Sequence, residues 1–435
     1  MITPPPGPKS RELSERLAKA ECPAFDARRQ TREETSGTSQ APIVYARGEG
    51  ANVIDVDGNR YVDLVAGFGA LIFGHSPKAI KEAISAQEEK LSLALGDVYA
   101  SDVKVELCER LAAIFPEPGA RVMLGLSGAD ALTAALKTVA LGGRSKIIAF
   151  EGGYHGLSHG PLAACGLAAG FREPFAGQSG DDWVSFLPYP SDPSTSLRVL
   201  RGLRALAETE KANPVTGAVL LEPVLGRGGV IALAPKFLKE LRAVCDEAGW
   251  LLVADEIFTG SGRGGALSLT LNELILPDIL CLGKGLGAGA PISAMIGRAH
   301  VMENWGAHHG TAIHTATHFG SPGACAAALA VIAALADGKM FAHVNELGEK
   351  FRNALIASTR RHDVVVRQHG MMIGIELVSS ARALSVMRAL LARGYIVLTG
   401  GSSGSVITLT PPLDIEEELL FAFATTLGEV LDTTG

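Results

Sequence analysis

The feature that most constrains this chain is a pair of apolar runs, each followed by one ionisable side chain, within residues 251–291. The segment reads LLVADEIFTGSGRGGALSLTLNELILPDILCLGKGLGAGAP. Residues 251–254 have the length and composition of a buried parallel strand and lead into Asp255, whereas residues 279–282 lead into Lys284, which is set among glycines. Because the carboxyl ends of parallel strands line the ligand crevice of an open α/β sheet, we expect Asp255 and Lys284 to face one pocket from neighbouring strands.

A carboxylate and an amine in one pocket suit a particular kind of chemistry. Partial burial lowers the pKa of a lysine, and the free amine can then form a Schiff base with an aldehyde. An aspartate beside a bound pyridine keeps the ring nitrogen protonated, as an electron-withdrawing cofactor requires. The glycines let the backbone approach a ligand closely. The simpler alternative is that Lys284 is a solvated loop lysine among ordinary turns.

A third strand end has the pattern of an anion site. Residues 122–126 form an apolar run that leads through Ser127, Gly128 and Ala129 into a helix expected to continue to residue 141. The backbone N–H groups at the start of such a helix, together with the Ser127 hydroxyl, suit a phosphate. A serine that only caps the helix would give the same sequence pattern.

Six segments, taken in order, resemble the class-III pyridoxal-phosphate-dependent aminotransferases, the group that includes 4-aminobutyrate and ornithine aminotransferases. The resemblance covers residues 61 to about 322, at family-like spacing. The segments are DVDGNRYVDL, LSGADA, FEGGYHG, LLEPVLGRGGV, the stretch from DEI to GKGLG, and THFGSP.

The resemblance implies an α/β architecture, the pyridoxal-phosphate transferase fold type I. Its large domain has a mostly parallel, seven-stranded-type sheet between helices, and its smaller domain is α+β. The expected division is an N-terminal segment of residues 1–65 that packs with the small domain, a large cofactor-binding domain of residues 66–327 and a C-terminal small domain of residues 328–435. Within the first segment, turn residues between alternating runs predict a small antiparallel sheet over residues 43–64.

The resemblance also implies pyridoxal 5′-phosphate as the cofactor and assigns residues to it. Lys284 would hold it as a Schiff base and act as general base and acid, and Asp255 would keep its ring protonated. The other expected cofactor contacts are Ser127, Gly128 and Ala129 at the phosphate, Tyr154 and Ile257 on the two ring faces, Glu222 in the hydrogen-bonded shell, His155, and Thr317. Thr317 would reach the phosphate of the neighbouring subunit, so the resemblance implies a homodimer with active sites at the subunit interface. His155 could equally be structural, and we assign it no proton transfer.

The chain departs from its relatives at the positions that recognise a substrate carboxylate. Many relatives have a glutamate and an arginine where this chain has Arg227 and Thr408. Threonine cannot bind a carboxylate bidentately, so use of 2-oxoglutarate through the usual contact is in doubt, and Arg227 is a candidate replacement. Phe68 is the third candidate substrate contact, although an ordinary core phenylalanine fits its surroundings equally. Phe258 stands where relatives often have glutamine.

These departures keep a second enzyme class open. The same family contains amino-acid and lactam racemases, which often show Ser-Gly-x-Asp-Ala, and this chain has that pattern from Ser127 to Ala131. A racemase needs no second substrate. Against this, Arg227 is always protonated and cannot be the second base that some racemases use. A non-catalytic protein of this fold is the third alternative, which the intact set of cofactor residues disfavours. We favour the aminotransferase, which moves an amino group from an amino acid or amine to a keto acid or aldehyde.

Composition narrows the partners and the compartment. The net charge of −7 argues against nucleic acid or an anionic membrane as a partner. The longest apolar stretch, residues 324–336, is shorter than a bilayer span and is typical of a buried helix. Prolines occupy the place where a signal peptide would be apolar, and the six cysteines lack metal or redox spacing. These features predict a cytoplasmic enzyme without a metal site or a membrane partner.

Three local expectations concern loops. Residues up to Ser10 look like a disordered tail, with Ser10 as the cap of a helix that continues to about residue 19. The polar residues 31–40 and the residues 159–190, which are rich in Gly, Pro and Ser, are expected to be loops, the second lying over the site.

Overall fold

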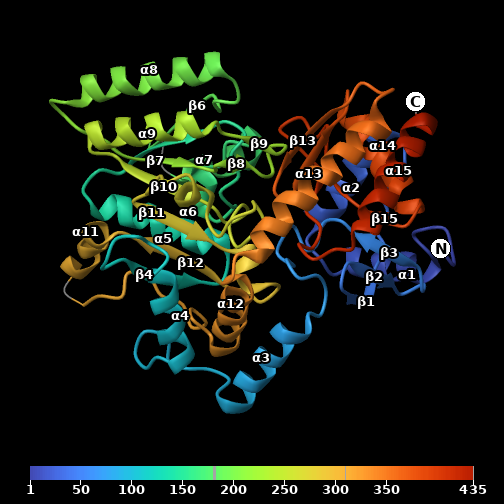
Figure 1. Cartoon of the computed structure of the whole chain (residues 1–435), viewed down its shortest axis with the longest axis horizontal. Helices are drawn as coiled ribbons and strands as arrows, with labels where there is room; N and C mark the ends of the chain where they lie inside the picture. The colour runs from blue at the N-terminus through green and yellow to red at the C-terminus, as the bar shows by residue number, and fades with distance from the viewer. Residues whose placement is uncertain (180–182, 309, 435) are drawn as a thin grey trace. The chain divides into compact units, whose positions relative to one another are not determined.

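The computed structural model describes residues 1–179, 183–308 and 310–434. The chain divides into two compact units, one made of Met1–Pro77 with Lys339–Gly435 and the other of Lys78–Gly338. Each unit has its own sheets and helices (Figure 1).

The second unit is built on a seven-stranded sheet with the order β4-β12-β11-β10-β7-β5-β6. Strands β11, β10, β7, β5 and β6 are parallel to one another, and β12 is antiparallel to both β11 and β4. The mostly parallel seven-stranded sheet is therefore confirmed. The strands are β4 (Arg121–Gly125), β5 (Lys146–Phe150), β6 (Val184–Leu187), β7 (Thr216–Leu221), β10 (Leu251–Asp255), β11 (Ile279–Leu282) and β12 (Ser293–Gly297), and a small hairpin consists of β8 (Val224–Leu225) and β9 (Ile231–Ala232).

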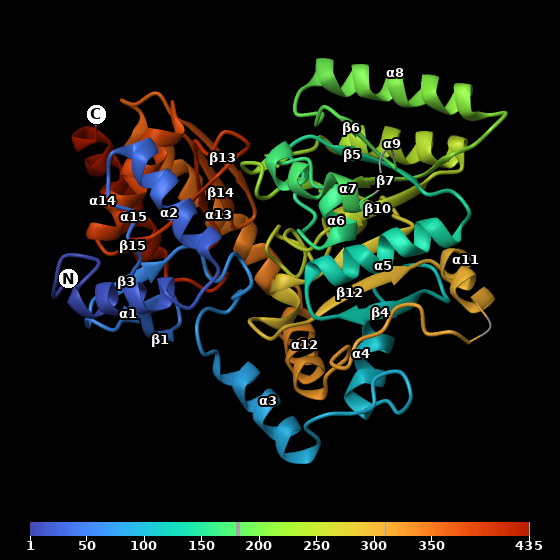
Figure 2. The same ribbon diagram turned by 180° about the vertical axis from the view of Figure 1, so that it is seen from behind.

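Helices cover both faces of this sheet, which explains its uninterrupted apolar strands. Ile147, Ala218 and Val253 point to the face that α5 covers, and their neighbours in each strand point to the other face. That second face packs against α8 and α9 over one half and against α4 and α12 over the other. Figure 2 shows α5 lying across the sheet in front of β12 and β4. Every residue of β7 and β11 is consequently buried, as expected for strands covered on two sides.

The remaining elements of the second unit are α3 (Lys78–Lys90), α4 (Asp102–Ala112), α5 (Gly128–Leu141), α6 (His159–Ala163), η1 (Ala169–Phe171), η2 (Glu173–Phe175), α7 (Ala176–Ser179), α8 (Pro193–Glu210), α9 (Pro235–Ala248), α10 (Leu269–Asn272), η3 (Lys284–Gly287), α11 (Ala299–Met302), η4 (Glu303–His308) and α12 (Pro322–Leu335). The apolar stretch near residue 330 is the buried helix that its composition predicts.

The first unit contains two four-stranded sheets, ordered β1-β2-β3-β15 and β13-β14-β17-β16. In the first, β15 from the C-terminal segment pairs in parallel with β3, so that both ends of the chain build one sheet. The elements are α1 (Pro8–Ala18), α2 (Pro23–Ser36), β1 (Tyr45–Glu49), β2 (Asn52–Asp55), β3 (Arg60–Asp63), α13 (Lys339–Thr359), β13 (Val365–His369), β14 (Met372–Glu376), α14 (Ser380–Ala392), β15 (Tyr395–Ile396), β16 (Leu398–Gly400), β17 (Val406–Leu409) and α15 (Glu417–Thr433). The antiparallel sheet expected near residues 43–64 is confirmed as β1, β2 and β3.

The two units divide after Pro77 and after Gly338, farther along the chain than the expected boundaries at 65 and 327. Residues after 65 stay with the first unit because their backbone is bonded there: His75 exchanges two hydrogen bonds with Gly50, and the carbonyl of Ile72 accepts the N–H of Leu413 at 2.7 Å. The later boundary follows the end of α12, which continues to Leu335.

The N-terminal residues are not a disordered tail, and this prediction is wrong. Asn59 Oδ1 accepts the N–H groups of Ile2 and Thr3 at 2.6 and 2.9 Å. Both carboxylate oxygens of Asp57 accept backbone N–H groups in the first turn of α1, which begins at Pro8. Ser10 lies inside that helix and does not cap it, because the Asp57 carboxylate, remote in sequence, occupies the helix start.

The two predicted loops are also largely wrong. Residues up to Ser36 belong to α2, which one side-chain contact ties to the C-terminal segment: Arg32 Nη2 donates to Thr399 Oγ1 at 2.7 Å. The described part of residues 159–190 contains the short helices α6, η1, η2 and α7 and the edge strand β6, which pairs with β5. In both places tertiary contacts order a segment whose local composition favours a loop.

Three broader observations concern the described residues. No single helix among them is long and apolar enough to cross a membrane, although the bent pair α12 and α13 passes that test by length and composition alone. All six cysteines are unpaired. The part of the chain that the structure describes holds no cluster of three His, Cys, Asp or Glu side chains arranged to bind a metal ion.

Candidate active site

Three ionisable side chains meet where neighbouring strands of the large sheet end. Asp255 is the last residue of β10, Glu222 follows β7, and Lys284 comes two residues after β11. Strand β10 lies between the other two and is parallel to both. The prediction that the strands of Asp255 and Lys284 are neighbours is therefore confirmed.

Asp255 is buried and both of its oxygens are occupied. Its Oδ2 lies 2.7 Å from Nδ1 of His155, and its Oδ1 accepts the N–H of Ile257 at 3.1 Å. Burial alone would lower the pKa of His155, but the bond to Asp255 and the charges of Asp255 and Glu222 raise it above its ordinary value. His155 therefore orients Asp255 and shares its charge.

Glu222 is buried and joins two loops of the site. Its Oε1 accepts the N–H of Tyr154 at 2.7 Å, and its Oε2 accepts the N–H of Gly226 at 3.1 Å. Burial and the nearby charge of Asp255 raise the pKa of Glu222. The carboxylate thus fixes the Tyr154 loop to the turn between β8 and β9.

Lys284 is half-buried and has an uncommon backbone conformation. Its φ of 41° lies in the left-handed region, where a residue with a side chain is strained. Burial lowers the pKa of Lys284 more than the negative charges of Asp255 and Glu222 raise it, and Arg227 lowers it further. The neutral amine, which is the nucleophilic form, is therefore more accessible here than on a solvated lysine.

Arg227 lies beside Tyr154 rather than beside a carboxylate. Its Cζ is 4.6 Å from the centroid of the Tyr154 ring, a cation–π distance. The Tyr154 ring also meets Phe171 of η1 edge to face, with centroids 6.4 Å apart. The short helix η1 thus helps to hold Tyr154 in place.

The start of α5 offers backbone donors beside the lysine loop. Asp130 accepts the N–H groups of Leu126 and Ser127, and the Ser127 hydroxyl accepts the N–H of Asp130. Among the described residues, the N–H groups of Gly128 and Ala129 have no hydrogen-bond acceptor, as is usual for the first turn of a helix.

Ile257 joins this helix start to the lysine loop. A Cβ at Gly128 would lie 2.7 Å from Cγ2 of Ile257, and a Cβ at Gly283 would lie 3.2 Å from the same atom. Glycine at both positions therefore lets Ile257 pack between the start of α5 and the residue that precedes Lys284.

These groups fit a flat, phosphorylated pyridine aldehyde. The amine of Lys284 can bind the aldehyde, the Asp255 carboxylate can face the ring nitrogen, and the N–H groups at the start of α5 can donate to a phosphate. The side chains of Tyr154 and Ile257 come from two loops that adjoin the same strand ends and supply the apolar contacts that a ring needs.

One residue beside the site was given no role from the sequence. Glu256, next to Asp255, is fully buried and accepts bonds from Thr259, Ser268, Thr270 and the N–H of Leu269, so it organises the loop after β10. Its position directly after a strand could have indicated a role for Glu256. The sequence did not show that most of its hydrogen-bond donors come from residues 268–270.

The remaining expected residues are Thr317, Phe68 and Thr408. Thr317 is exposed within the second unit. Phe68 and Thr408 belong to the first unit: Phe68 is 60% exposed, and Thr408 lies on β17, where its hydroxyl donates to the carbonyl of Leu398 at 3.3 Å.

Comparison with known proteins agrees with this geometry. The family described as aminotransferase class-III matches residues 34–431. An acetylornithine aminotransferase from Methanosarcina mazei is 36% identical over 87% of this chain and 89% of its own, and a 4-aminobutyrate aminotransferase from Escherichia coli is 32% identical over 86% and 90%. Among solved structures, a PLP-bound amine transaminase from an uncultivated Pseudomonas species superposes with a TM-score of 0.82 at 29% identity, covering 91% of this chain and 95% of that one.

Proposed function

The chain belongs to the class-III aminotransferases, which depend on pyridoxal phosphate, and from this premise we propose that Lys284 and Asp255 are its catalytic residues. The enzyme moves an amino group from an amino acid or amine to a keto acid or aldehyde. The bound cofactor supplies an aldehyde that captures amines and a protonated ring that withdraws electrons. The observation that supports the proposal most directly is an amine of lowered pKa on a strand end adjacent to the buried pair of Asp255 and His155.

Lys284 has two tasks in the proposed mechanism. Its Nζ anchors the cofactor in the resting enzyme, and once the substrate amine has displaced it, the free Nζ removes the proton from the substrate Cα. The same nitrogen later returns that proton. A lowered pKa suits this alternation, because it brings the neutral and protonated forms of the amine closer in free energy near neutral pH.

Asp255 is proposed to hold a proton on the cofactor ring nitrogen. The negative charge that this requires is kept in place by His155, which binds the other side of the carboxylate at 2.7 Å. His155 is therefore a positioning residue in this scheme and transfers no proton itself.

The remaining cofactor contacts follow from the same arrangement. Ser127, Gly128 and Ala129 would bind the phosphate, Tyr154 and Ile257 would contact the ring, and Glu222 would hold the Tyr154 loop. We propose that the partner subunit's Thr317 completes the phosphate site.

We propose that the enzyme is a homodimer. Leu95, Val98 and Tyr99, which follow α3, are 63, 67 and 69% exposed, an apolar group that a second copy of the chain could cover. Sedimentation of Tyr99→Glu and of the wild type would test this. If Tyr99 lies in the interface, the substitution should shift the equilibrium from dimer towards monomer. Equal dimer fractions would reject this surface.

We propose that Arg227 recognises a carboxylate of the substrate. Its guanidinium is close enough to Lys284 to affect the pKa of that amine, and its contact with Tyr154 leaves it without a fixed carboxylate partner in the contacts described above. Phe68 and Thr408 remain candidate substrate contacts. The proposed compartment is the cytoplasm, which the unpaired cysteines support.

A spectral titration of the purified holoenzyme tests the proposal. Amino compounds are added without any keto acid, and the visible absorption of the bound cofactor is followed. Conversion to the pyridoxamine form identifies an amino donor. A band that persists while the substrate exchanges its α-hydrogen with deuterated water, or loses optical activity, would favour the racemase, for which the Ser-Gly-Ala-Asp-Ala segment is the motivating observation.

A further inference from the structure

One aromatic side chain of the site has no role in the mechanism above. Phe258 follows Ile257, and its ring centroid lies 4.1 Å from Nζ of Lys284. At this distance an ammonium group is attracted by the negative face of the ring, whereas a neutral amine is not. Phe258 therefore acts on one protonation state of Lys284.

Gly226 makes room for this ring. A Cβ at position 226 would overlap the Phe258 ring at Cδ1 and Cε1. The backbone of Gly226 is itself fixed, because its N–H donates to Oε2 of the buried Glu222 at 3.1 Å. The ring is thus packed against a rigid turn and also contacts the reactive amine.

We propose that Phe258, seated against Gly226, is a positioning residue that holds the protonated amine of Lys284 in place between its two proton transfers. This inference rests on the proposed role of Lys284. It gives a function to the glycine as well, because any side chain at position 226 would displace the ring.

The other charged groups that act on Lys284 come from three elements. Asp255 at the end of β10 and Glu222 after β7 favour the ammonium form, whereas Arg227 in the turn between β8 and β9 and burial of the amine oppose it. The ring acts in the same direction as the two carboxylates. Removing the ring should therefore lower the pKa of Lys284 further.

The test uses the apoenzyme, so that the readout is separate from turnover. Wild type, Phe258→Leu and Phe258→Tyr are mixed with pyridoxal phosphate across a range of pH and reduced with borohydride after fixed times. Mass spectrometry then quantifies the pyridoxyl group on Lys284. The midpoint is the pH at which the rate of cofactor capture reaches half of its maximum. We expect this midpoint to move down by about 0.5–1 pH unit in Phe258→Leu and to stay unchanged in Phe258→Tyr.

Two further variants separate the ring from general loosening of the site. Gly226→Ala should move the midpoint in the same direction as Phe258→Leu, and if Gly226→Ala fails to fold, Phe258→Leu alone decides. Phe175→Leu removes a phenylalanine that packs on His159 outside the site and should leave the midpoint unchanged.

Each outcome has one reading. An unmoved or higher midpoint in Phe258→Leu overturns the inference, as does an equal shift in Phe258→Tyr or Phe175→Leu. If no pyridoxyl group is found on Lys284 of the wild type, the proposed function itself fails. Capture at Lys284 with an unmoved midpoint in Phe258→Leu leaves the proposed function intact and rejects only the role of Phe258.

Discussion

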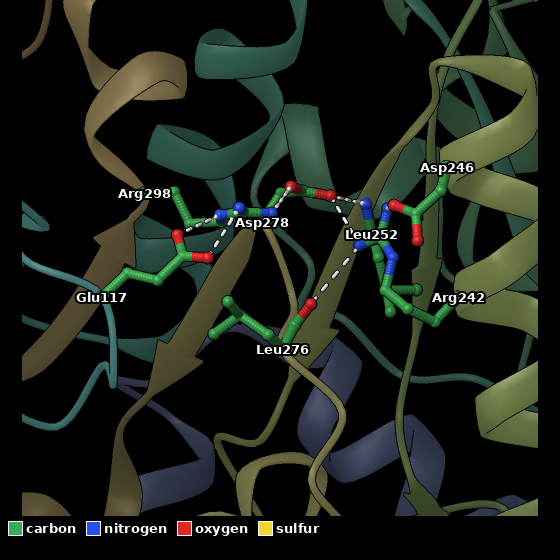
Figure 3. A network of polar contacts seen from close by, with 7 residues as sticks. All are labelled: Glu117, Arg242, Asp246, Leu252, Leu276, Asp278 and Arg298. Atoms are coloured by element: carbon green, nitrogen blue, oxygen red, sulfur yellow. Dashed lines mark hydrogen bonds and ion pairs between the residues drawn. The ribbon is translucent and has the colours of Figure 1, made fainter.

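Strands β10 and β11 have charged residues at both of their ends, but the surroundings of those residues differ. The amino ends hold a network of ion pairs, whereas the carboxyl ends hold an amine of lowered pKa. At the carboxyl ends lie Asp255 and Lys284. At the amino ends lies Asp278, directly before β11, with two arginines around it (Figure 3). The comparison separates charges that stabilise the sheet from charges that are available for chemistry.

At the amino ends every charge has a partner. Asp278 Oδ2 accepts from Nη1 of Arg242 at 2.7 Å and from the N–H of Leu252 at 2.8 Å, and Oδ1 accepts from Nη1 of Arg298 at 3.1 Å. Outer carboxylates complete the network: Asp246 pairs with Arg242, and Glu117 binds Arg298 twice at 2.9 Å. The result joins β10, β11 and the end of β12.

The pKa directions express the difference. Burial favours the neutral form of both cations, yet the charge and hydrogen bond of Asp278 raise the pKa of Arg242, whereas the pKa of Lys284 is lowered. The carboxylates near Lys284 are occupied by other donors, His155 and Ile257 for Asp255 and two backbone N–H groups for Glu222. Burial of the amine therefore outweighs these two charges, and the pKa of Lys284 is lowered.

The largest expected effect is at the carboxyl ends. Lys284→Ala should lower turnover by at least about 10⁴-fold, because it removes both the anchor and the proton carrier, while cofactor binding remains largely intact. Steady-state rates and cofactor content by absorbance measure this. A variant that retains full activity would overturn the assignment of Lys284.

Substitutions at the amino ends of β10 and β11 should change the stability of the protein and not its turnover. Asp278→Asn leaves two arginines near a neutral amide and should lower the free energy of unfolding by about 3 kcal/mol, with turnover per folded molecule unchanged. Urea unfolding of the apoenzyme measures it. Asp246→Asn is the matched control, since its carboxylate is largely exposed and should contribute at most about 1 kcal/mol. Equal losses in the two variants would contradict the comparison.

Substitution of Arg227 tests whether this guanidinium, near the carboxyl ends of the strands, binds the substrate. Arg227→Met should raise KM for donors that carry a carboxylate by about 10²-fold, because a charge-assisted bidentate contact is lost, and should leave KM for simple amines nearly unchanged. Paired assays with a carboxylated donor and its decarboxylated analogue distinguish the two. An unchanged KM for the carboxylated donor would end this hypothesis.

The smallest expected effect is a gain in stability at the site. Because the pKa of Lys284 is lower in the folded than in the unfolded chain, protonation of this amine favours unfolding. The protein therefore loses stability as the pH falls from the ordinary lysine pKa towards the lower pKa of the folded state. Lys284→Met in the apoenzyme should therefore raise Tm by about 1–3 °C at pH 7, with a smaller gain near pH 10. A lower Tm at pH 7 would show that the amine is stabilising after all.

The sequence alone predicted much of the large sheet and the core of the site. Strands covered on both faces are continuous apolar runs, so β5, β10 and β11 could be predicted from the sequence. Because ligands bind at the carboxyl ends of parallel strands, Asp255 and Lys284 were expected to lie on neighbouring strands, as they do. The prediction failed for the N-terminal residues, because Asn59 and Asp57, both remote in sequence, accept the backbone N–H groups that order them.

The same limit applies to the network around Asp278. Nothing in its local sequence indicates that Arg242 and Arg298, from two other elements, converge on one carboxylate. The contact between Phe258 and Gly226 is of the same kind, since a missing side chain in one turn is matched to a ring in another.

The sequence by itself determined which residue types stand at the strand ends, because a buried strand is specified by its own run of apolar side chains. Only the tertiary structure decided which donors occupy each carboxylate and how deeply Lys284 is buried, and burial is the main cause that lowers the pKa of Lys284. His155 and Asp255 are 100 residues apart in the chain, and their 2.7 Å contact exists only in the folded sheet. Reactivity in this protein depends on such contacts, because a buried charge is governed by its nearest partners and not by its neighbours in sequence.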